Sequence, residues 1–440
     1  MGVLRYSDGI KPRHFLTYLF SVLIASGYAG SIAVLQPALL TLIGVPQEEQ
    51  GNVTGMLAAM QEVILIVLLG VIGAVSDRVG RKATYAFGFI VTSLGFYLYP
   101  HAGSVEALFA YRAIIAVGTA AMLGMMVTVV ADYCTNDTRG KANGFQGAVA
   151  TVGAAIPMVF AALPSVFVAR GQGEFEAQQS TFAVAAAMGV VAAAVVLIGL
   201  APRSTQPQPG RVGLLRILSD GATAVRDKGV ALSYGAAFIS RGDLAVTGAF
   251  LNLWLIQYGT AQLGMSFSEA MAQLAFPAIG FILLGAIVGA VLMGVFADII
   301  SKAAAVTTAS GLAALVYMSM FFVADPTAAW VRGLLFLMGV AEISAFVSSQ
   351  ALVGQQARPQ HRGAVIGFFG VAGAVGILVA TTGGGIVFDR IGASAPFVIF
   401  GALNLVVFLW GLAVFRRVRV PEWSAEDPQP QAEPAALPVA

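Results

Sequence analysis

The sequence predicts an all-α polytopic membrane protein with twelve transmembrane helices in two pseudo-symmetric six-helix bundles. Three observations lead to this fold class: a low charge content, a series of long apolar runs and an internal repeat. Of the 440 residues, 58% are hydrophobic and only 10% are charged, whereas a soluble domain carries about 25% charged residues. This composition excludes a soluble globular chain and a disordered chain, and the single cysteine, Cys134, allows no internal disulfide.

Twelve apolar runs follow the polar and basic residues 1–13. A membrane-spanning helix needs about 20 apolar residues, whereas a barrel strand has about ten with strict alternation. The runs are long and apolar on all sides, so each predicts one spanning helix. They cover residues 14–43, 52–75, 82–100, 105–131, 143–168, 181–201, 229–258, 270–297, 302–323, 328–352, 363–388 and 394–415.

Two segments are polar, one in the middle of this series of runs and one at its end. Residues 202–228 hold three prolines and several charged residues, which is typical of a linker with a short amphipathic piece. Residues 421–440 are rich in Pro, Glu and Ala, a composition typical of disorder. We therefore expect an N-terminal six-helix half at 1–201, a cytoplasmic linker at 202–228, a C-terminal half at 229–420 and a disordered tail at 421–440.

The distribution of basic residues predicts the orientation in the membrane. With twelve spans both termini lie on one side, and the loops of that side carry 19 of the 24 Lys and Arg residues. The opposite loops carry only Arg170 and Arg390. Because cytoplasmic loops are enriched in Lys and Arg, we expect both termini in the cytoplasm, and we expect a bacterial inner membrane.

Three pairs of similar segments indicate that the two halves repeat. All three share nearly one offset, between 220 and 223 residues. Such repeats are typical of secondary transporters, whose substrate site lies between the halves near the bilayer midplane. The pairs are 73–82 with 294–302, 139–147 with 362–370, and Arg112 with Arg332.

The segment from Gly73 to Lys82 is similar to the signature loop between the second and third helices of the major facilitator superfamily. That pattern is Gly, three residues, Asp, Arg, one residue, Gly, Arg and Lys, and it is complete here. With the twelve runs, the linker and the degraded second copy, the resemblance covers the whole chain. It implies the family's fold and transport activity, and it matches Arg112 to the family's fourth-helix arginine. The signature that antiporters of this family carry in the fifth helix is absent, because residues 153–157 match it only in part.

The same loop has a physical interpretation as a cytoplasmic latch. A carboxylate at a helix end can face the positive N-terminus of a neighbouring helix, basic side chains can pair with a carboxylate such as that of Asp132, and glycines permit tight turns. The alternative is that the basic residues serve orientation alone, although orientation requires neither Asp77 nor the glycines. The resemblance also implies a latch. The latch residues are Gly73, Asp77, Arg78, Gly80, Arg81, Lys82, Asp132 and, in the second copy, Asp298.

Six ionisable residues lie inside the expected spans. Each costs at least about 2.5 kcal/mol near the bilayer centre unless it faces a cavity or a partner, so we interpret all six as functional. The carboxylates are candidates for proton coupling, because desolvation favours proton loading; the alternative for each is a static ion pair. Glu62 and Arg112 lie at similar depths and can pair, whereas Arg332 and Glu342 are too far apart along one helix. The candidates for proton coupling are Glu62, Asp243 and Glu342, and the cationic residues, for substrate or charge pairing, are Arg112, Arg241 and Arg332.

Two polar stripes predict cavity-lining faces. In the first span, the alternative is that the hydroxyls bond to their own helix backbone. In the seventh span, Asp243 points almost opposite to Arg241, so either one of them packs against a neighbour or the helix breaks near Gly242 or Gly248. The two stripes are Thr17, Ser21 and Tyr28, and Tyr234, Arg241 and Asn252.

These features predict a secondary active transporter that moves a small, amphipathic organic solute by alternating access, coupled to protons. The alternatives are a passive facilitator of the same fold and a non-transporting membrane receptor. An enzyme is not expected, since no paired His and carboxylate, metal-ligand spacing or Ser-His arrangement is found. We expect a monomer whose partners are the substrate, protons and the lipid bilayer, with no nucleic acid, cofactor or metal.

Overall fold

The computed structural model of the protein describes residues 4–135, 138–201, 219, 221–358 and 362–418. The described chain is helical, and it has no strand beyond an isolated bridge between Tyr6 and Cys134. The expected tail and most of the expected linker lie outside these residues, as do the residues that follow the expected limits at 201 and 420.

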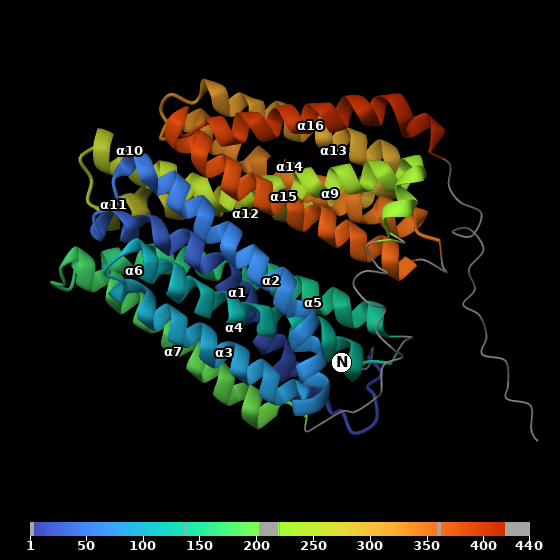
Figure 1. Ribbon diagram of the computed structural model, residues 1–440, viewed down its shortest axis with the longest axis horizontal. Coiled ribbons are helices and arrows are strands. Elements are labelled where there is room, and N and C mark those ends of the chain that lie inside the picture. The colour runs from blue at the N-terminus through green and yellow to red at the C-terminus, as the bar shows by residue number, and fades with distance from the viewer. Residues whose placement is uncertain (1–3, 136–137, 202–218, 220, 359–361, 419–440) are drawn as a thin grey trace, which may run out of the picture.

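The helices form two groups that follow each other along the chain (Figure 1). The first bundle contains α1 (Pro12–Leu42), α2 (Gln50–Val79), α3 (Arg81–Leu98), α4 (Val105–Tyr133), α5 (Arg139–Gly153), α6 (Ile156–Val168) and α7 (Glu174–Gly199). The second bundle contains α9 (Lys228–Val246), α10 (Asn252–Gln262), α11 (Phe267–Ala270), α12 (Phe276–Ile299), α13 (Lys302–Ser319), α14 (Ala329–Gln356), α15 (Arg362–Arg390) and α16 (Ala395–Val414). Short 3-10 segments are η1 (Gln47–Glu49), η2 (Tyr99–His101), η3 (Ala224–Arg226), η6 (Met320–Phe322) and η8 (Phe415–Arg417), and π-helical segments are η4 (Thr247–Leu251) and η5 (Met271–Ala275).

Ten helices of the described chain are long and apolar enough to cross a membrane. The other two expected spans correspond to α3 and to the continuous stretch α9–η4–α10. The stretch from α9 is more polar, because its first helix carries Lys228, Arg241 and Asp243. The structure is therefore consistent with twelve spans, and length and composition identify ten of them.

Two expected spans are not regular helices. The run 143–168 is divided, because α5 ends at Gly153 and α6 begins at Ile156. Pro157 in the first turn of α6 has no N–H to donate to the carbonyl of Gly153, which interrupts the helix there. The seventh span becomes π-helical at Thr247–Leu251, around Gly248. Neither irregularity reduces the apolar character of its run, so neither changes the number of expected spans.

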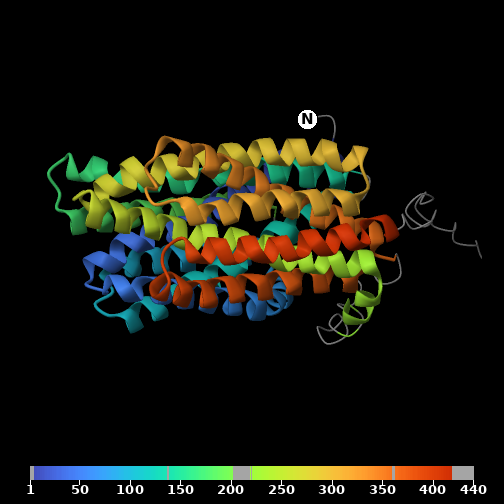
Figure 2. The same cartoon turned by 90° about the horizontal axis from the view of Figure 1, so that it is seen from above.

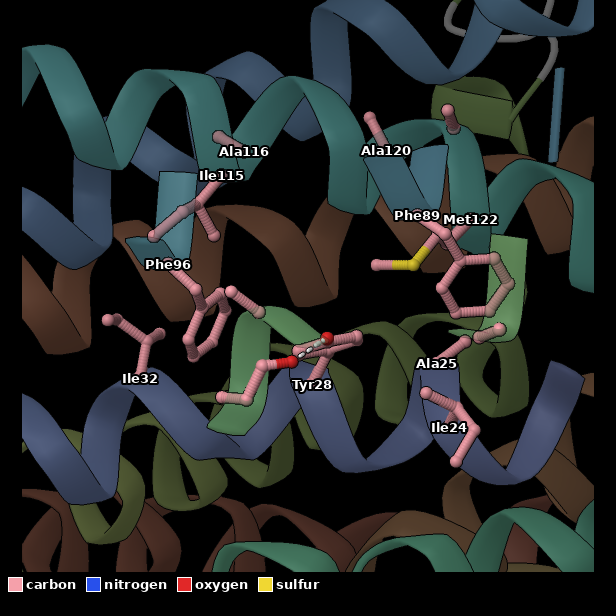
Figure 3. Close-up of a cluster of buried hydrophobic side chains, with 14 of the residues drawn as sticks. Ile24, Ala25, Tyr28, Ile32, Phe89, Phe96, Ile115, Ala116, Ala120 and Met122 are labelled. Carbon is pink, nitrogen blue, oxygen red and sulfur yellow. Dashed lines mark hydrogen bonds between the residues drawn. The ribbon is translucent and has the colours of Figure 1, made fainter. Parts of the chain in front are cut away.

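Each bundle has its own apolar core. In the first bundle the Tyr28 ring packs on Phe96 with ring centroids 5.0 Å apart, and its hydroxyl donates to the carbonyl of Ala185 on α7 (Figure 3). On the outside, large apolar side chains such as Ile198 are exposed, in that case by 85%. Exposed apolar side chains of this size are what a surface in contact with lipid requires.

The helices run roughly along the long axis of the molecule in both views (Figures 1 and 2). We call the end at which α1 begins and α16 ends the terminal end, and the opposite end the distal end. Within the described chain, the hydrogen bonds between the bundles all lie at the distal end. The core of the first bundle continues there into Ile256, Ala270 and Met271 of the second. Toward the terminal end the two bundles diverge (Figure 1).

Candidate functional site

Glu342 of α14 lies at the centre of a ring of three oxygen atoms inside the second bundle. Its side chain is 3% exposed, and its Oε1 accepts hydrogen bonds from the hydroxyls of Thr247, in the π-helical segment, and of Tyr317 on α13. The two hydroxyl oxygens are themselves 2.8 Å apart. The ring thus has three close contacts, but the two hydroxyls supply only two protons. All three contacts become hydrogen bonds only when the Glu342 carboxyl carries the third proton.

Asp243 of α9 is fully buried against α16. Both carboxylate oxygens contact a single atom, Nδ2 of Asn404, at 3.0 and 2.9 Å, and that nitrogen also donates to the carbonyl of Phe400. An amide group has two N–H hydrogens, so little donation remains for the carboxylate. A buried carboxylate with so few donors is poorly stabilised in its ionised form.

The two buried carboxylates belong to one cluster. Thr247, which donates to Glu342, lies one turn after Asp243, and its backbone N–H donates to the carbonyl of Asp243. Among the described residues, no Lys or Arg forms a hydrogen bond or ion pair with either carboxylate. Two carboxylates without a cation cannot both remain ionised at low cost in an apolar interior, so this cluster is suited to hold a proton.

Arg112 of α4 is 5% exposed and lies in the first bundle. Its Nη1 donates to Gln36 Oε1 of α1 at 3.0 Å, and the Tyr99 hydroxyl donates to the same oxygen at 2.7 Å. Arg112 therefore joins α4 to α1, and it does not form the pair with Glu62 that the similar depths had indicated. Its Nε atom has no hydrogen-bond partner among the described residues.

Glu62 and Arg241 carry charge at the seam between the bundles. Glu62 on α2 is half-buried, and Arg241 on α9 is the cation that acts on it electrostatically. The Arg241 guanidinium lies over the Phe346 ring at 5.6 Å, and Gly373 of α15 leaves room for its side chain. Arg241 and Asp243 thus point to different neighbours, and the helix is also irregular just beyond them. Arg332 is exposed on α14 and, as expected from its position, does not pair with Glu342.

The stripe of the first span faces the interior of its own bundle rather than the seam. Thr17 lies against Gly199 and Tyr28 against Gly189, both on α7. The Thr17 and Ser21 hydroxyls donate to carbonyls one turn earlier in α1, at 3.0 and 2.8 Å. These two hydroxyls therefore bond to their own helix backbone, which was the alternative to a cavity lining. The glycines of α7 leave room for the side chains of Thr17 and Tyr28.

The stripe of the seventh span is split by the π-helical segment. Tyr234 is buried, and its hydroxyl donates to the carbonyls of Gly221 and Val365, which ties the start of α9 to α15. Asn252 is also buried, and its Oδ1 has no hydrogen-bond partner in the described chain. Because a π turn holds more residues than an α turn, Asn252 does not keep the helical register that placed it with Tyr234 and Arg241.

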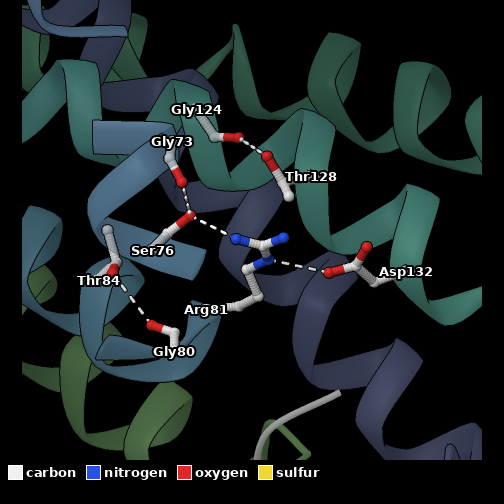
Figure 4. A network of polar contacts seen from close by, with 8 residues as sticks. All are labelled: Gly73, Ser76, Gly80, Arg81, Thr84, Gly124, Thr128 and Asp132. Atoms are coloured by element: carbon white, nitrogen blue, oxygen red, sulfur yellow. Dashed lines mark hydrogen bonds and ion pairs between the residues drawn. The ribbon is translucent and has the colours of Figure 1, made fainter. Parts of the chain in front are cut away.

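The loop of the predicted latch is built within the first bundle (Figure 4). Arg81 Nε pairs with Asp132 Oδ2 at 2.9 Å, as expected for that carboxylate, and Arg81 Nη1 donates to Ser76 Oγ at 2.6 Å. Ser76 in turn donates to the carbonyl of Gly73, and Gly80 has a φ of +104°, which favours glycine. These contacts join α2, α3 and α4 and do not reach the second bundle.

The remaining latch residues are only partly placed. Arg78 is exposed and Lys82 is half-buried, and both border a cavity of about 450 Å³ at the terminal end. The side chains of Asp77 and Asp298 lie outside what the structure describes. The residues that sequence reasoning missed are the neutral partners of the buried charges: Gln36, Tyr99, Thr247, Tyr317 and Asn404. Gln36 and Asn404 were detectable in principle, because an amide side chain inside an apolar run is itself unusual.

Comparison with known proteins identifies the family. A model described as the Major Facilitator Superfamily matches residues 15–381 and 333–438. The chain is 24% identical over 424 residues to the magnetosome protein MamH of Paramagnetospirillum magneticum, covering 93% of this chain and 94% of that protein. It is 24% identical over 380 residues to the chromaffin granule amine transporter of Rattus norvegicus, covering 83% and 66% of the two chains.

Solved structures share the fold. A bacterial homologue of the human lysosomal transporter Spinster, in an inward-facing and unoccupied conformation, matches with a TM-score of 0.71 and 16% identity, covering 93% of this chain and 98% of that one. The nucleoside transporter NupG matches with a TM-score of 0.71 and 17% identity, covering 91% and 99%. The helical two-bundle fold, the loop from Gly73 to Lys82 and the family match over most of its length show that this chain belongs to the major facilitator superfamily, a family of transporters rather than enzymes.

Proposed function

We propose that this protein is a secondary active transporter that moves a small amphipathic organic solute by alternating access and couples this movement to protons. The observation that carries the proton coupling is the cluster of Asp243 and Glu342. These two carboxylates are buried close together, and no Lys or Arg of the described chain pairs with either. The three contacts around Glu342 need three protons, and the two hydroxyls supply only two.

The cluster is placed to sense movement of the helices. Thr247 lies in the π-helical segment of the seventh span, and π segments occur often at functional sites in helices. A change in this segment moves the Thr247 hydroxyl relative to Glu342 on α14. Loss of that donor changes how well the ionised carboxylate is stabilised, which links proton release to helix geometry.

The orientation of the proposed cycle follows from the basic loops. We assign the terminal end to the cytoplasm of a bacterial inner membrane, since 19 of the 24 basic residues belong to its loops. The bundles diverge at that end and touch at the distal end, so we interpret this conformation as inward-facing. In the opposite conformation the distal contacts would open and the bundles would approach at the terminal end, where the loop from Gly73 to Lys82 lies.

The substrate class rests on the polarity of the seam. Away from the distal end, Glu62 and Arg241 carry charge at the seam, and the neighbouring spans are apolar. Such a site favours a molecule with a large apolar surface and one or two polar groups. A thermal-shift screen of the purified protein against amphipathic amines, lipids and nucleosides would identify a compound that binds.

Proteoliposomes with an imposed pH gradient test the coupling once such a compound is known. We expect accumulation with the gradient and only equilibration without it. Glu342→Gln and Asp243→Asn should lose the gradient-driven accumulation and keep binding, because a neutral amide resembles the protonated carboxyl. Glu106→Gln is the matched control, since this carboxylate is exposed on the first turn of α4 and should transport normally.

The other candidate functions give different results in the same assay. If the flux is equal with and without the gradient, and if both variants transport like the original protein, proton coupling is refuted. The protein is then a passive facilitator. Binding without any flux would identify a receptor.

A further inference from the structure

Asp389, at the end of α15 in the second bundle, caps a helix of the first bundle. Its Oδ1 accepts from the backbone N–H of Gly51 at 2.9 Å, and its Oδ2 accepts from that of Asn52 at 2.6 Å. Both amides lie in the first turn of α2, where backbone N–H groups have no partner within the helix. The carboxylate thus meets the positive end of the α2 dipole across the distal seam.

A second carboxylate makes the reverse contact. Glu174, the first residue of α7 in the first bundle, accepts from the backbone N–H of Ser268 at 3.2 Å and from its hydroxyl at 2.5 Å. Ser268 lies at the start of α11, which continues through η5 into α12 as the eighth span. Each bundle therefore supplies one carboxylate to the N-terminal turn of a helix in the other.

The helices that receive the two carboxylates are equivalent in the two halves. Asn52 lies in the first turn of the second span and Ser268 in the first turn of the eighth. The carboxylates themselves come from different elements, because Asp389 lies at the end of the eleventh span and Glu174 at the start of the sixth. The pseudo-symmetry therefore extends to the capped helices, and each bundle supplies its carboxylate from a different place.

Close backbone packing makes the Asp389 contact dependent on contact between the bundles. A Cβ atom on Gly51 would collide with Asp389 and Phe388, and one on Gly55 would collide with the carbonyl of Thr381. The carboxylate therefore reaches the amides only while α2 and α15 touch. It also borders a cavity of about 410 Å³, from which water can replace the amides when the helices separate.

We propose that Asp389 and Glu174 form a two-point gate that holds the distal end closed. Each carboxylate caps a helix of the opposite bundle, and both contacts must break for the bundles to part at that end. The gate rests on the alternating-access mechanism proposed above. Changing either carboxylate to its amide removes the negative charge at the helix N-terminus, so each change should weaken the closed state about fivefold. The two effects should multiply, because the two caps share no hydrogen-bond partner.

Distance measurements between spin labels test the gate in the purified full-length protein without any substrate. The native Cys134 is first replaced by Ser. One label pair reports the distal end, at exposed positions Ala169→Cys and Leu263→Cys, and a second pair reports the terminal end, at Phe145→Cys and Ile299→Cys. We expect Asp389→Asn and Glu174→Gln each to raise the population with a long distal distance and, in parallel, the population with a short terminal distance.

Control variants separate the gate from a general loss of packing. Glu48→Gln removes an exposed carboxylate beside the same cavity and should leave both distributions unchanged. Gly51→Ala leaves Asp389 intact and should shift the distributions as Asp389→Asn does, because the added methyl group holds the helices apart.

Two further outcomes are distinguishable. If two populations exist but Asp389→Asn and Glu174→Gln behave like Glu48→Gln, the gate is refuted and alternating access stands. If one fixed distance is found at both ends in every variant, alternating access fails, and the gate fails with it.

Discussion

Three oxygen atoms, on Thr247, Tyr317 and Glu342, show how single residues determine the chemistry of the second bundle. Each atom contacts the other two, so the protonation of Glu342 decides whether the ring is complete. Asp243 differs, because Asn404 is its only described hydrogen-bond partner. We therefore expect the Glu342 ring to be the more sensitive of the two to single-atom changes.

Removal of the Tyr317 hydroxyl should shift the pH dependence of transport. The hydroxyl donates to the carboxylate, and a hydrogen bond to an ionised group is about 1 kcal/mol stronger than one to a neutral group. Tyr317→Phe therefore costs the ionised form more, and uptake measured against pH should move upward by a little less than about one unit.

A second buried tyrosine provides the control for this change. Tyr85→Phe removes the hydroxyl of an equally buried tyrosine that has no hydrogen-bond partner in the described chain, and its profile should stay in place. An unchanged profile for Tyr317→Phe would show that the ring does not carry the transported proton.

At the scale of elements, the irregular positions of the helices determine where side chains point. The proline in α6 divides the fifth span, and the π-helical segment divides the seventh. Gly80 produces the tight turn between α2 and α3, with a positive φ that other residues rarely adopt. This turn brings Arg81 to both Ser76 and Asp132.

Gly80→Ala should destabilise this turn. Nothing lies within 4 Å of the added Cβ, so the cost is backbone strain alone, about 1–3 kcal/mol. Chemical unfolding in detergent should show the loss. Gly103→Ala is the matched control, because Gly103 is equally open and lacks a positive φ. Equal stability of the two variants would contradict the strain at Gly80.

At the scale of the whole molecule, charge and contact are distributed unequally between the two ends. The basic loops gather at the terminal end, whereas the described hydrogen bonds between the bundles gather at the distal end. If the first asymmetry sets the orientation and the second sets the conformation, the protein faces the cytoplasm with its bundles apart.

The orientation can be measured with single cysteines in intact cells. In a Cys134→Ser background, a membrane-impermeant thiol reagent should label Ala169→Cys from outside and should label Ser301→Cys only after the cells are opened. Both positions are exposed and lie outside the expected spans, so the difference reports the side of the membrane rather than burial. The reverse pattern would overturn the cytoplasmic assignment of the terminal end.

The fold class, the approximate course of the spans, the loop from Gly73 to Lys82 and the six ionisable residues in the spans can all be predicted from the amino-acid sequence. These features are local: an apolar run, a turn motif or a charge in an apolar run can be identified without knowing its neighbours. The expected pairing of a basic loop residue with Asp132 is also found, through Arg81, because both lie at ends of consecutive helices.

The contacts between side chains depend on how the helices pack, which the sequence pattern does not reveal. Arg112 contacts Gln36 and not Glu62, Asp243 contacts Asn404, and the stripe of the first span faces α7. The position of a residue along its helix limits its partners to residues at the same depth in the membrane. Which of them it contacts depends on how each helix is rotated about its axis and which helix lies beside it. Packing around small residues, such as the glycines of α7, sets both. The contacts of Asp389 and Glu174 lay outside the prediction for the same reason, because they join elements more than 90 residues apart in the chain.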